Sequence, residues 1–170
     1  MEKITRWITR FLSVFLTILM VVIVLDVTWQ VITRFVLKNP SSYTEELAGF
    51  LLIWIGILGA SYALHTKSHL GIDVLTERLQ HRWRPITEII VHGIVFFFAL
   101  FVLVVGGVRL VRLTLTLDQV APALGIRIGY VYLVLPISGV LMMVYSLDFI
   151  LLVLRPTKGE DIRKTVRGLD

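Results

Sequence analysis

The segment NPSSYTEELAGFLLIWIGILGASYALHTKSHLGIDVL, residues 39–75, contains an apolar run with a polar boundary at each end. Glu45 and Glu46 come immediately before the run, and a segment rich in His, Lys and Asp follows it. The run is long enough to cross a hydrocarbon core of roughly 30 Å as a helix. The segment therefore predicts a membrane-spanning helix over residues 47–64 whose ends are set by polar residues at the two interfaces.

Three further apolar runs accompany this one, near residues 11–36, 86–108 and 130–154. Hydrophobic residues make up 56% of the 170 residues, which is more than a soluble domain contains. We therefore predict an all-α integral membrane protein, a single domain over residues 1–170 with four transmembrane helices and short amphipathic interfacial helices. One such interfacial helix is expected over residues 66–83, where Ile72, Leu75 and Leu79 share a face.

Basic residues predict the orientation of these helices. Most of the 17 Lys and Arg residues lie beside the N-terminus, in the second connection or in the C-terminal tail, which places both termini in the cytoplasm. The first apolar run follows Lys3, Arg6 and Arg10 but precedes no small-x-small cleavage site, so we interpret it as an uncleaved anchor. The basic residues that give the net charge of +5 are then expected to interact with anionic membrane headgroups rather than with nucleic acid.

The second span carries two local patterns. Ser42 and Glu45 have the spacing of a capping box, in which each side chain accepts the backbone amide hydrogen of the other residue at the helix start. Small residues then share one side of the helix, at Gly56, Gly59, Ala60 and Ala63. Such a face permits close approach of another helix, either in the chain's own bundle or in a different subunit, and the pattern alone favours neither.

Asp26, Gln30 and Arg34 recur every four residues inside the first span, where an uncompensated charge costs roughly 2.5 to 3.5 kcal/mol on insertion scales. Two interpretations are open. The residues form either an ion-coupling site or a structural network in which Gln30 bridges the two charges or Arg34 reaches the interface. We favour the structural network, because an arginine neutralises a neighbouring carboxylate.

His65, His69 and Asp73 also recur every four residues, a spacing that suits a metal ion. A glycine interrupts the helix between them and no further ligand lies nearby, so we interpret them as solvated or hydrogen-bonded interfacial residues. His92, four residues after Glu88, lacks the second intramembrane histidine that a haem anchor needs. Cysteine is absent. We therefore expect neither a metal nor another cofactor.

Three features of the last third predict structure rather than chemistry. The Leu/Thr alternation from Leu113 to Leu117 has the period of a strand, but an open strand edge near hydrocarbon leaves backbone groups unpaired, so a helical extension of the third span is expected. Pro136 is expected to kink the fourth helix or mark its first turns. Asp148 is expected to pair with Arg155 or with another helix. No nucleophile–base pair, glycine-rich phosphate loop or acidic cluster indicates an enzyme.

Several short motifs occur in order along the chain. They are Arg34, Pro40, Tyr-Thr-Glu-Glu-Leu at 43–47, Leu-Gly-Ala at 58–60, His-Leu-Gly-Ile-Asp-Val-Leu at 69–75, Ala-Pro-Ala-Leu-Gly-Ile at 121–126 and the stretch 130–136. In this order they resemble the DctQ-like small membrane subunit of tripartite ATP-independent periplasmic (TRAP) transporters. Tyr43 stands where that family often has tryptophan, and Arg127 stands where proline is common.

The resemblance implies a protein of the bacterial inner membrane that works with a large membrane subunit and a periplasmic solute-binding protein. The large subunit would hold the substrate and sodium sites, and the solute would be an organic acid of dicarboxylate or sialic acid type. The small subunit would pack on the large subunit and extend its scaffold, surrounded by membrane lipids. The residues expected to be structural or to contact the large subunit are Arg34, Glu45, Glu46, Gly56, Gly59, Ala60, His69 and Asp73. Those expected to contact the binding protein are Ser41, Ser42, Pro122 and Ala123.

A rival function belongs to a different class of protein. It is a self-contained small exporter that acts as a homodimer and couples transport to protons through Asp26.

Overall fold

The computed structural model describes residues 2–39, 41–66 and 84–154. The described chain is helical, apart from connecting loops and one isolated antiparallel bridge between Val120 and Arg127. In chain order its helices are α1 (Glu2–Phe35), α2 (Ser42–His65), α4 (Arg84–Phe98), the π-helix η1 (Ala99–Gly106), α5 (Gly107–Thr116), α6 (Ile128–Val131) and α7 (Val134–Leu154).

Within these residues, four helical segments are long and apolar enough to cross a membrane: Thr5–Phe35, Ser42–His65, Ile89–Thr116 and Ile128–Leu151. The predicted all-α fold with four spans is therefore confirmed. The third span consists of α4, η1 and α5 in succession and continues to Thr116, so the helical extension expected at Leu113 to Leu117 is also confirmed. The interfacial helix expected at 66–83 lies outside the described residues, except for Thr66, which ends α2.

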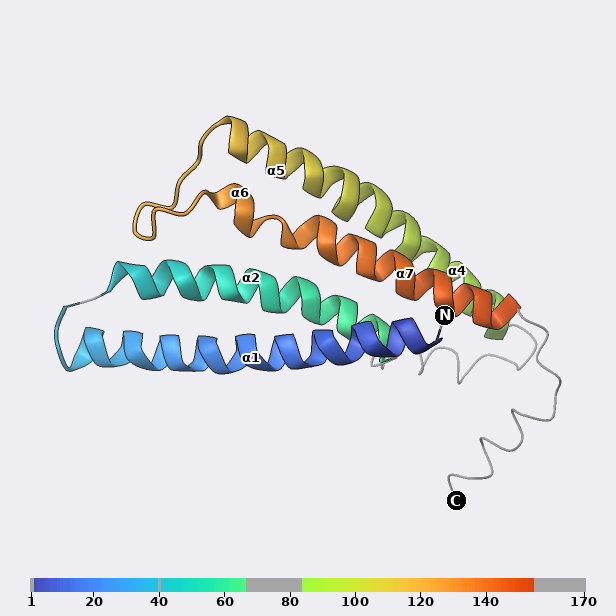
Figure 1. Ribbon diagram of the computed structural model, residues 1–170, viewed down its shortest axis with the longest axis horizontal. Helices are drawn as coiled ribbons and strands as arrows, with labels where there is room; N and C mark the ends of the chain where they lie inside the picture. The colour runs from blue at the N-terminus through green and yellow to red at the C-terminus, as the bar shows by residue number, and fades with distance from the viewer. Residues whose placement is uncertain (1, 40, 67–83, 155–170) are drawn as a thin grey trace, which may run out of the picture.

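The spans are arranged as a single layer rather than a closed bundle. α1 packs mainly on α2, α2 packs on α7, and α7 packs on the third span, so the helices lie side by side in the order α1, α2, α7, α4–α5 (Figure 1). They converge at the end where Glu2 and Leu154 lie, here called the terminal end, and spread apart at the loop end, where residues 36–39 and 117–127 lie (Figure 1).

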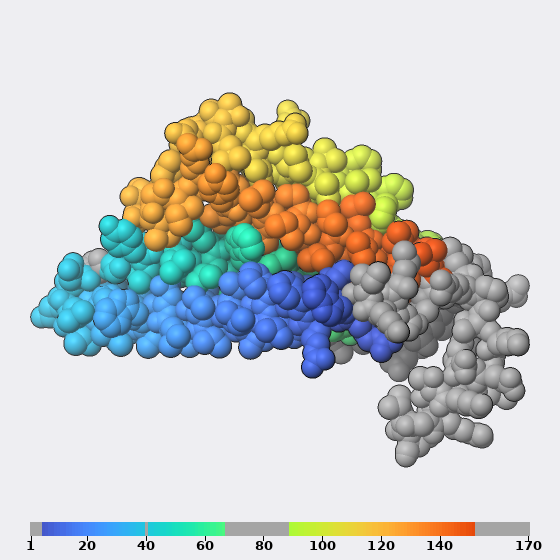
Figure 2. Space-filling model, in the orientation of Figure 1, coloured from blue at the N-terminus to red at the C-terminus, as the bar shows by residue number. Residues whose placement is uncertain are grey.

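Large apolar side chains remain on the outside of this layer. Trp7, Phe11 and Leu25 of α1 are exposed, as are Phe97 and Phe101 of the third span. Figure 2 shows the surface of one side, on which α2 lies between α1 and α7. Lipid tails are as apolar as these side chains, so their exposure carries no penalty in a bilayer.

The buried apolar core lies mostly where α1, α2 and α7 converge. It consists of Leu12, Leu58, Leu64, Val134 and Tyr145. At its edge the Phe15 ring meets the Trp54 ring edge-on, with centroids 6.3 Å apart. The Thr9 hydroxyl donates to the Tyr145 hydroxyl at 3.2 Å, which ties α1 directly to α7.

Three glycines allow the third span and the fourth to approach closely. A Cβ added at Gly139 would lie 2.8 Å from both Leu103 Cβ and Val104 Cγ2 and 3.1 Å from the Val104 backbone nitrogen. A Cβ at Gly107 would lie 2.9 Å from Leu135 Cβ, and one at Gly129 would lie 2.6 Å from two Leu115 carbons. The π-helical segment η1 therefore meets α7 at the residue where α7 has no side chain.

Pro136 was expected either to kink the fourth helix or to mark its first turns, and it lies in the first turn of α7. The break in the fourth span comes just before it. α6 ends at Val131 and α7 begins at Val134. The amide of Leu135 donates to the Tyr132 carbonyl at 3.0 Å, which tightens the turn that joins the two helices. A proline has no amide hydrogen, so it is tolerated where a helix begins.

The packing of Gly139 generates a stability prediction. Gly139→Ala is expected to destabilise the folded chain by about 1–3 kcal/mol, because the added methyl group meets helix backbone as well as side chains. Gly56→Ala is the matched control, because a Cβ at Gly56 meets nothing within 4 Å. Thermal unfolding of the purified chain in detergent measures both. Equal melting temperatures for Gly139→Ala and wild type would contradict the packing of η1 on α7.

Candidate functional site

Glu46, in the first turn of α2, holds the loop of residues 117–127. Its carboxylate accepts the amide hydrogen of Ala123 at 3.0 and 3.1 Å, through its two oxygens, and the amide hydrogen of Leu124 at 2.9 Å. Hydrogen bonds to a charged group contribute roughly 1.5–3 kcal/mol each when they are partly buried. This contact fastens the start of the second span to the loop that precedes the fourth.

The local fold of the loop leaves these two amides available. Asp118, just beyond the end of α5, has a left-handed backbone at φ 48°. There the Gln119 amide donates to the Thr114 carbonyl, and the Asp118 amide donates to the Leu115 carbonyl. Further along the loop, the Gly125 amide donates to the Ala121 carbonyl, and the Gly125 backbone is left-handed at φ 66°. Successive free amides in such a turn form a concave anion site. Glu46 fills that site from within the chain.

Two further side chains of α2 bond to the chain beyond this loop. The Trp54 indole donates to the Val131 carbonyl at 3.1 Å, beside the break between α6 and α7. The Ser61 hydroxyl lies 2.7 Å from the Ser138 hydroxyl, which donates to the Ile57 carbonyl at 3.1 Å. Both serines are completely buried. We call Glu46, Trp54 and Ser61 the bonding stripe of α2.

The bonding stripe has a constant sequence offset from its partners. Glu46 to Ala123, Trp54 to Val131 and Ser61 to Ser138 are each separated by 77 residues. The stripe residues follow one another at intervals of two helical turns, so they lie on one face of α2. α2 and the segment from Ala123 to Ser138 therefore run parallel in a single register, although that segment includes a loop and a helix break.

The capping box predicted at Ser42 and Glu45 is wrong. Ser41 is the N-cap of α2, its side chain makes no capping bond, and Ser42 is the first helical residue. The third helical position is consequently Thr44, whose hydroxyl donates back to the Ser41 carbonyl at 2.9 Å. Glu45 lies one position too far along to close the box, and its side chain is exposed.

Two of the small residues of α2, Gly56 and Ala60, do not pack against the described part of the chain. Gly56 and Ala60 are exposed and Gly59 and Ala63 are half-buried, while a Cβ at Gly49, Gly56 or Gly59 would meet nothing within 4 Å. Of the two alternatives, packing within the chain's own bundle is therefore excluded for Gly56 and Ala60. We call the exposed strip from Gly49 through Gly56 to Ala60 the small-residue face of α2. Leu52 is its one exposed large residue, in contrast to α1.

The bridged network expected in α1 is absent from the described structure. No hydrogen bond or ion pair of the described residues joins Asp26, Gln30 and Arg34, and Oδ2 of Asp26 is buried with no hydrogen-bond partner there. Asp26 and Arg34 are eight residues apart, about 12 Å along a helix, which is far for one glutamine to span. Arg34 is exposed instead, with its guanidinium carbon 6.0 Å from the centre of the Phe35 ring.

The two described histidines of the membrane spans stack on rings of α7. The His65 ring lies 4.6 Å from the Tyr145 ring, and the His92 ring lies 3.9 Å from the Phe149 ring, centre to centre. Within the described residues no three metal-ligating side chains come together. His69, Asp73 and Arg155, to which the other expectations refer, lie outside the described residues, so their predicted roles stay predictions.

Sequence reasoning missed the contacts of the bonding stripe. Ser61 and Ser138 carried a usable signal, because hydroxyl groups in apolar spans commonly bond between helices. Trp54 carried another, since its indole nitrogen needs an acceptor when it is buried in a membrane. The partners of Glu46 had no comparable signal, because they are backbone amides of Ala123 and Leu124.

Comparison with known proteins extends this description. Residues 23–155 match the family model of the DctQ component of tripartite ATP-independent periplasmic transporters. The isethionate TRAP transporter permease protein DctMQ of Oleidesulfovibrio alaskensis is 34% identical over 129 residues, which are 72% of this chain and 20% of that protein. The sialic acid TRAP transporter permease protein SiaT of Haemophilus influenzae is 30% identical over 115 residues, which are 67% of this chain and 18% of that protein.

A third relative has a length closer to that of this chain. The sialic acid TRAP transporter small permease protein SiaQ of Vibrio cholerae is 26% identical over 122 residues, which are 72% of this chain and 69% of that protein. The chain thus spans about a fifth of the first two relatives and most of the third. The family match covers all four spans at least in part. The chain belongs to the DctQ family, the small membrane subunits of TRAP transporters.

Proposed function

We propose that this small subunit packs on a large membrane subunit and extends its scaffold, in a transporter that takes up an organic acid with sodium and with a periplasmic solute-binding protein. The observation that carries the proposal is the small-residue face of α2, which is exposed in the folded chain. Relatives in which a homologous segment is about a fifth of a longer permease support a membrane partner of that size.

The layered fold supports a scaffold rather than a transport path. The described helices lie side by side in one layer and enclose no passage for a solute among themselves, so we assign translocation and the sodium sites to the large subunit. The names of the relatives mention isethionate and sialic acid, both organic acids, which supports the same solute class here. The self-contained exporter has weaker support, because the family assignment accounts for the chain without proton coupling at Asp26.

We place both termini in the cytoplasm and the loop end in the periplasm of a bacterial inner membrane, from the distribution of Lys and Arg. In this orientation Ser41, Ser42, Pro122 and Ala123 face the periplasm and offer a contact to the solute-binding protein. Glu46 is then a positioning residue, because it holds the loop that contains Pro122 and Ala123. At the opposite end, His69 and Asp73 are proposed to contact the large subunit or to set the depth of α2.

The first test is co-purification of the tagged chain with its genomic neighbours in mild detergent. A large membrane protein is expected to elute with the wild-type chain in stoichiometric amount. Gly56→Leu is expected to reduce that yield at least about tenfold, because side-chain bulk keeps two helix backbones apart. Gly106→Leu is the matched control, as an exposed glycine on the third span. Normal recovery of the large subunit with Gly56→Leu would remove the small-residue face from the interface.

A second prediction concerns the loop. Glu46→Ala is expected to speed hydrogen exchange at the amides of Ala123 and Leu124 at least about tenfold, because both lose a charge-assisted hydrogen bond. Glu45→Ala is the matched control, because Glu45 is exposed beside it. A crosslinker at Ala123 should also capture the binding protein less often in the Glu46 variant. Unchanged exchange would show that the loop holds its shape without the carboxylate.

Sodium coupling is tested in proteoliposomes that contain both membrane subunits, with the binding protein and its solute added outside. Uptake is expected when a sodium gradient points inward and not when potassium replaces sodium. Vesicles with the large subunit alone are expected to transport more slowly, because the scaffold is incomplete. Uptake of equal rate without sodium would contradict the coupling, and equal rate without the small subunit would contradict the scaffold role.

A further inference from the structure

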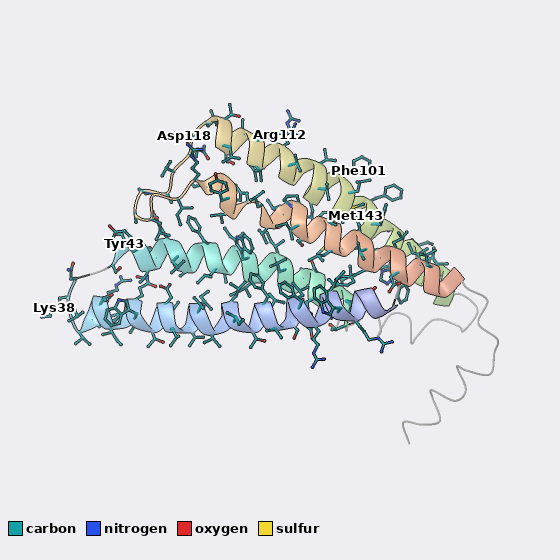
Figure 3. The ribbon with its side chains drawn as sticks, viewed as in Figure 1. Lys38, Tyr43, Phe101, Arg112, Asp118 and Met143 are labelled. Atoms are coloured by element: carbon teal, nitrogen blue, oxygen red, sulfur yellow. The ribbon has the colours of Figure 1, made fainter. Side chains whose placement is uncertain are left out.

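The exposed side of the third span changes from apolar to cationic along its length. Toward its middle it exposes Phe98, Phe101 and Val105, and in its last turns it exposes Arg109 and Arg112. Figure 3 shows Phe101 and Arg112 pointing away from the rest of the layer. Apolar and cationic side chains therefore follow one another along the outer side of a single helix.

The length of the span places the two arginines at a membrane boundary. The apolar stretch of the helix begins at Ile89, and the part from Ile89 to Val108 has the roughly 20 residues that a helix needs to cross the hydrocarbon core. Arg109 follows immediately, and Arg112 lies about one turn beyond it. Phe98 lies near the middle of this stretch, so the part from Phe98 to Arg109 corresponds to roughly one leaflet of hydrocarbon.

Neither guanidinium has a protein partner among the described residues. No ion pair and no side-chain hydrogen bond of the described chain involves the Arg109 or Arg112 side chain. The nearby loop carboxylate, Asp118, is paired with Arg127 at 3.1 Å. An arginine stays charged at every physiological pH, so two exposed arginines three residues apart form a lasting cationic site.

We propose that Arg109 and Arg112 bind the phosphate of an anionic phospholipid, in the leaflet at the loop end, and that its acyl chains lie along Phe98, Phe101 and Val105. Three observations favour lipid over a protein acid as the occupant. The cations lie at headgroup depth, an exposed apolar strip of one leaflet's length leads to them, and they lie at the edge of the layer. Guanidinium groups match phosphate oxygens by two parallel hydrogen bonds.

The experiment is native mass spectrometry of the purified full-length chain, with its membrane partner where that co-purifies. The probes are phosphatidylglycerol and phosphatidylcholine with identical acyl chains. The wild type is expected to retain phosphatidylglycerol over phosphatidylcholine by roughly tenfold or more, since each basic residue near a headgroup adds to the attraction. Arg109→Gln with Arg112→Gln is expected to lose this preference. Arg109→Lys with Arg112→Lys is expected to keep a reduced one.

Arg127→Gln is the matched control, because it removes a cation from the same end of the chain that is already paired with Asp118. Its lipid preference is expected to equal that of the wild type. Equal retention of the two lipids by the wild type, or an unchanged preference in the double glutamine variant, would overturn the proposal. So would loss of the large subunit from that variant with the preference intact, which would assign the arginines to a protein contact. The comparison of the two lipids can be made with this chain alone, so its failure is distinct from failure of the proposed scaffold role.

Discussion

The bonding stripe of α2 is the interaction on which the rest of the structure depends. Glu46, Trp54 and Ser61 bond to residues 77 positions further along the chain, at the loop, at the break between α6 and α7, and in α7 itself. One of these partners, the Val131 carbonyl, is a backbone group left over where the fourth span is interrupted between α6 and α7. In hydrocarbon such groups have no water to bond, so an interrupted span is stable only beside an element that supplies the missing partners. α2 supplies them.

The same absence of water explains why the fold is a layer. Burial of apolar surface does not drive helices together in lipid, so association depends on close packing and on hydrogen bonds. Gly107, Gly129 and Gly139 give the third and fourth spans that close packing, and the bonding stripe joins α2 to α7. α1 packs chiefly on α2, and the Thr9–Tyr145 hydrogen bond links it to α7. The apolar outer sides of the layer remain exposed.

Sequence predicted the spans well because length and hydropathy reflect the thickness of the bilayer directly. It also predicted the helical course of Leu113 to Leu117 correctly, since the need to pair backbone groups outweighs a local alternation. It failed where the answer depended on one residue of register. The start of α2 at Ser42 rather than one residue later moves Glu45 out of the capping position and leaves Glu46 facing the loop. Two adjacent glutamates look equivalent in sequence, and only the helix phase separates them.

The glycines are a second case in which the sequence does not reveal how a helix is rotated. Gly56 and Gly139 both lie within an apolar helix, yet Gly139 is buried against η1 and Gly56 faces outward. Which glycine packs within the chain is decided by how each helix is rotated, and α2 is rotated by its bonding stripe. Because that stripe turns Glu46, Trp54 and Ser61 toward the fourth span, the face with Gly49, Gly56 and Ala60 must turn out of the layer. The internal contacts of α2 thus determine the surface it presents, so a change that loosens the stripe should alter the proposed subunit interface even though the changed residue lies outside it.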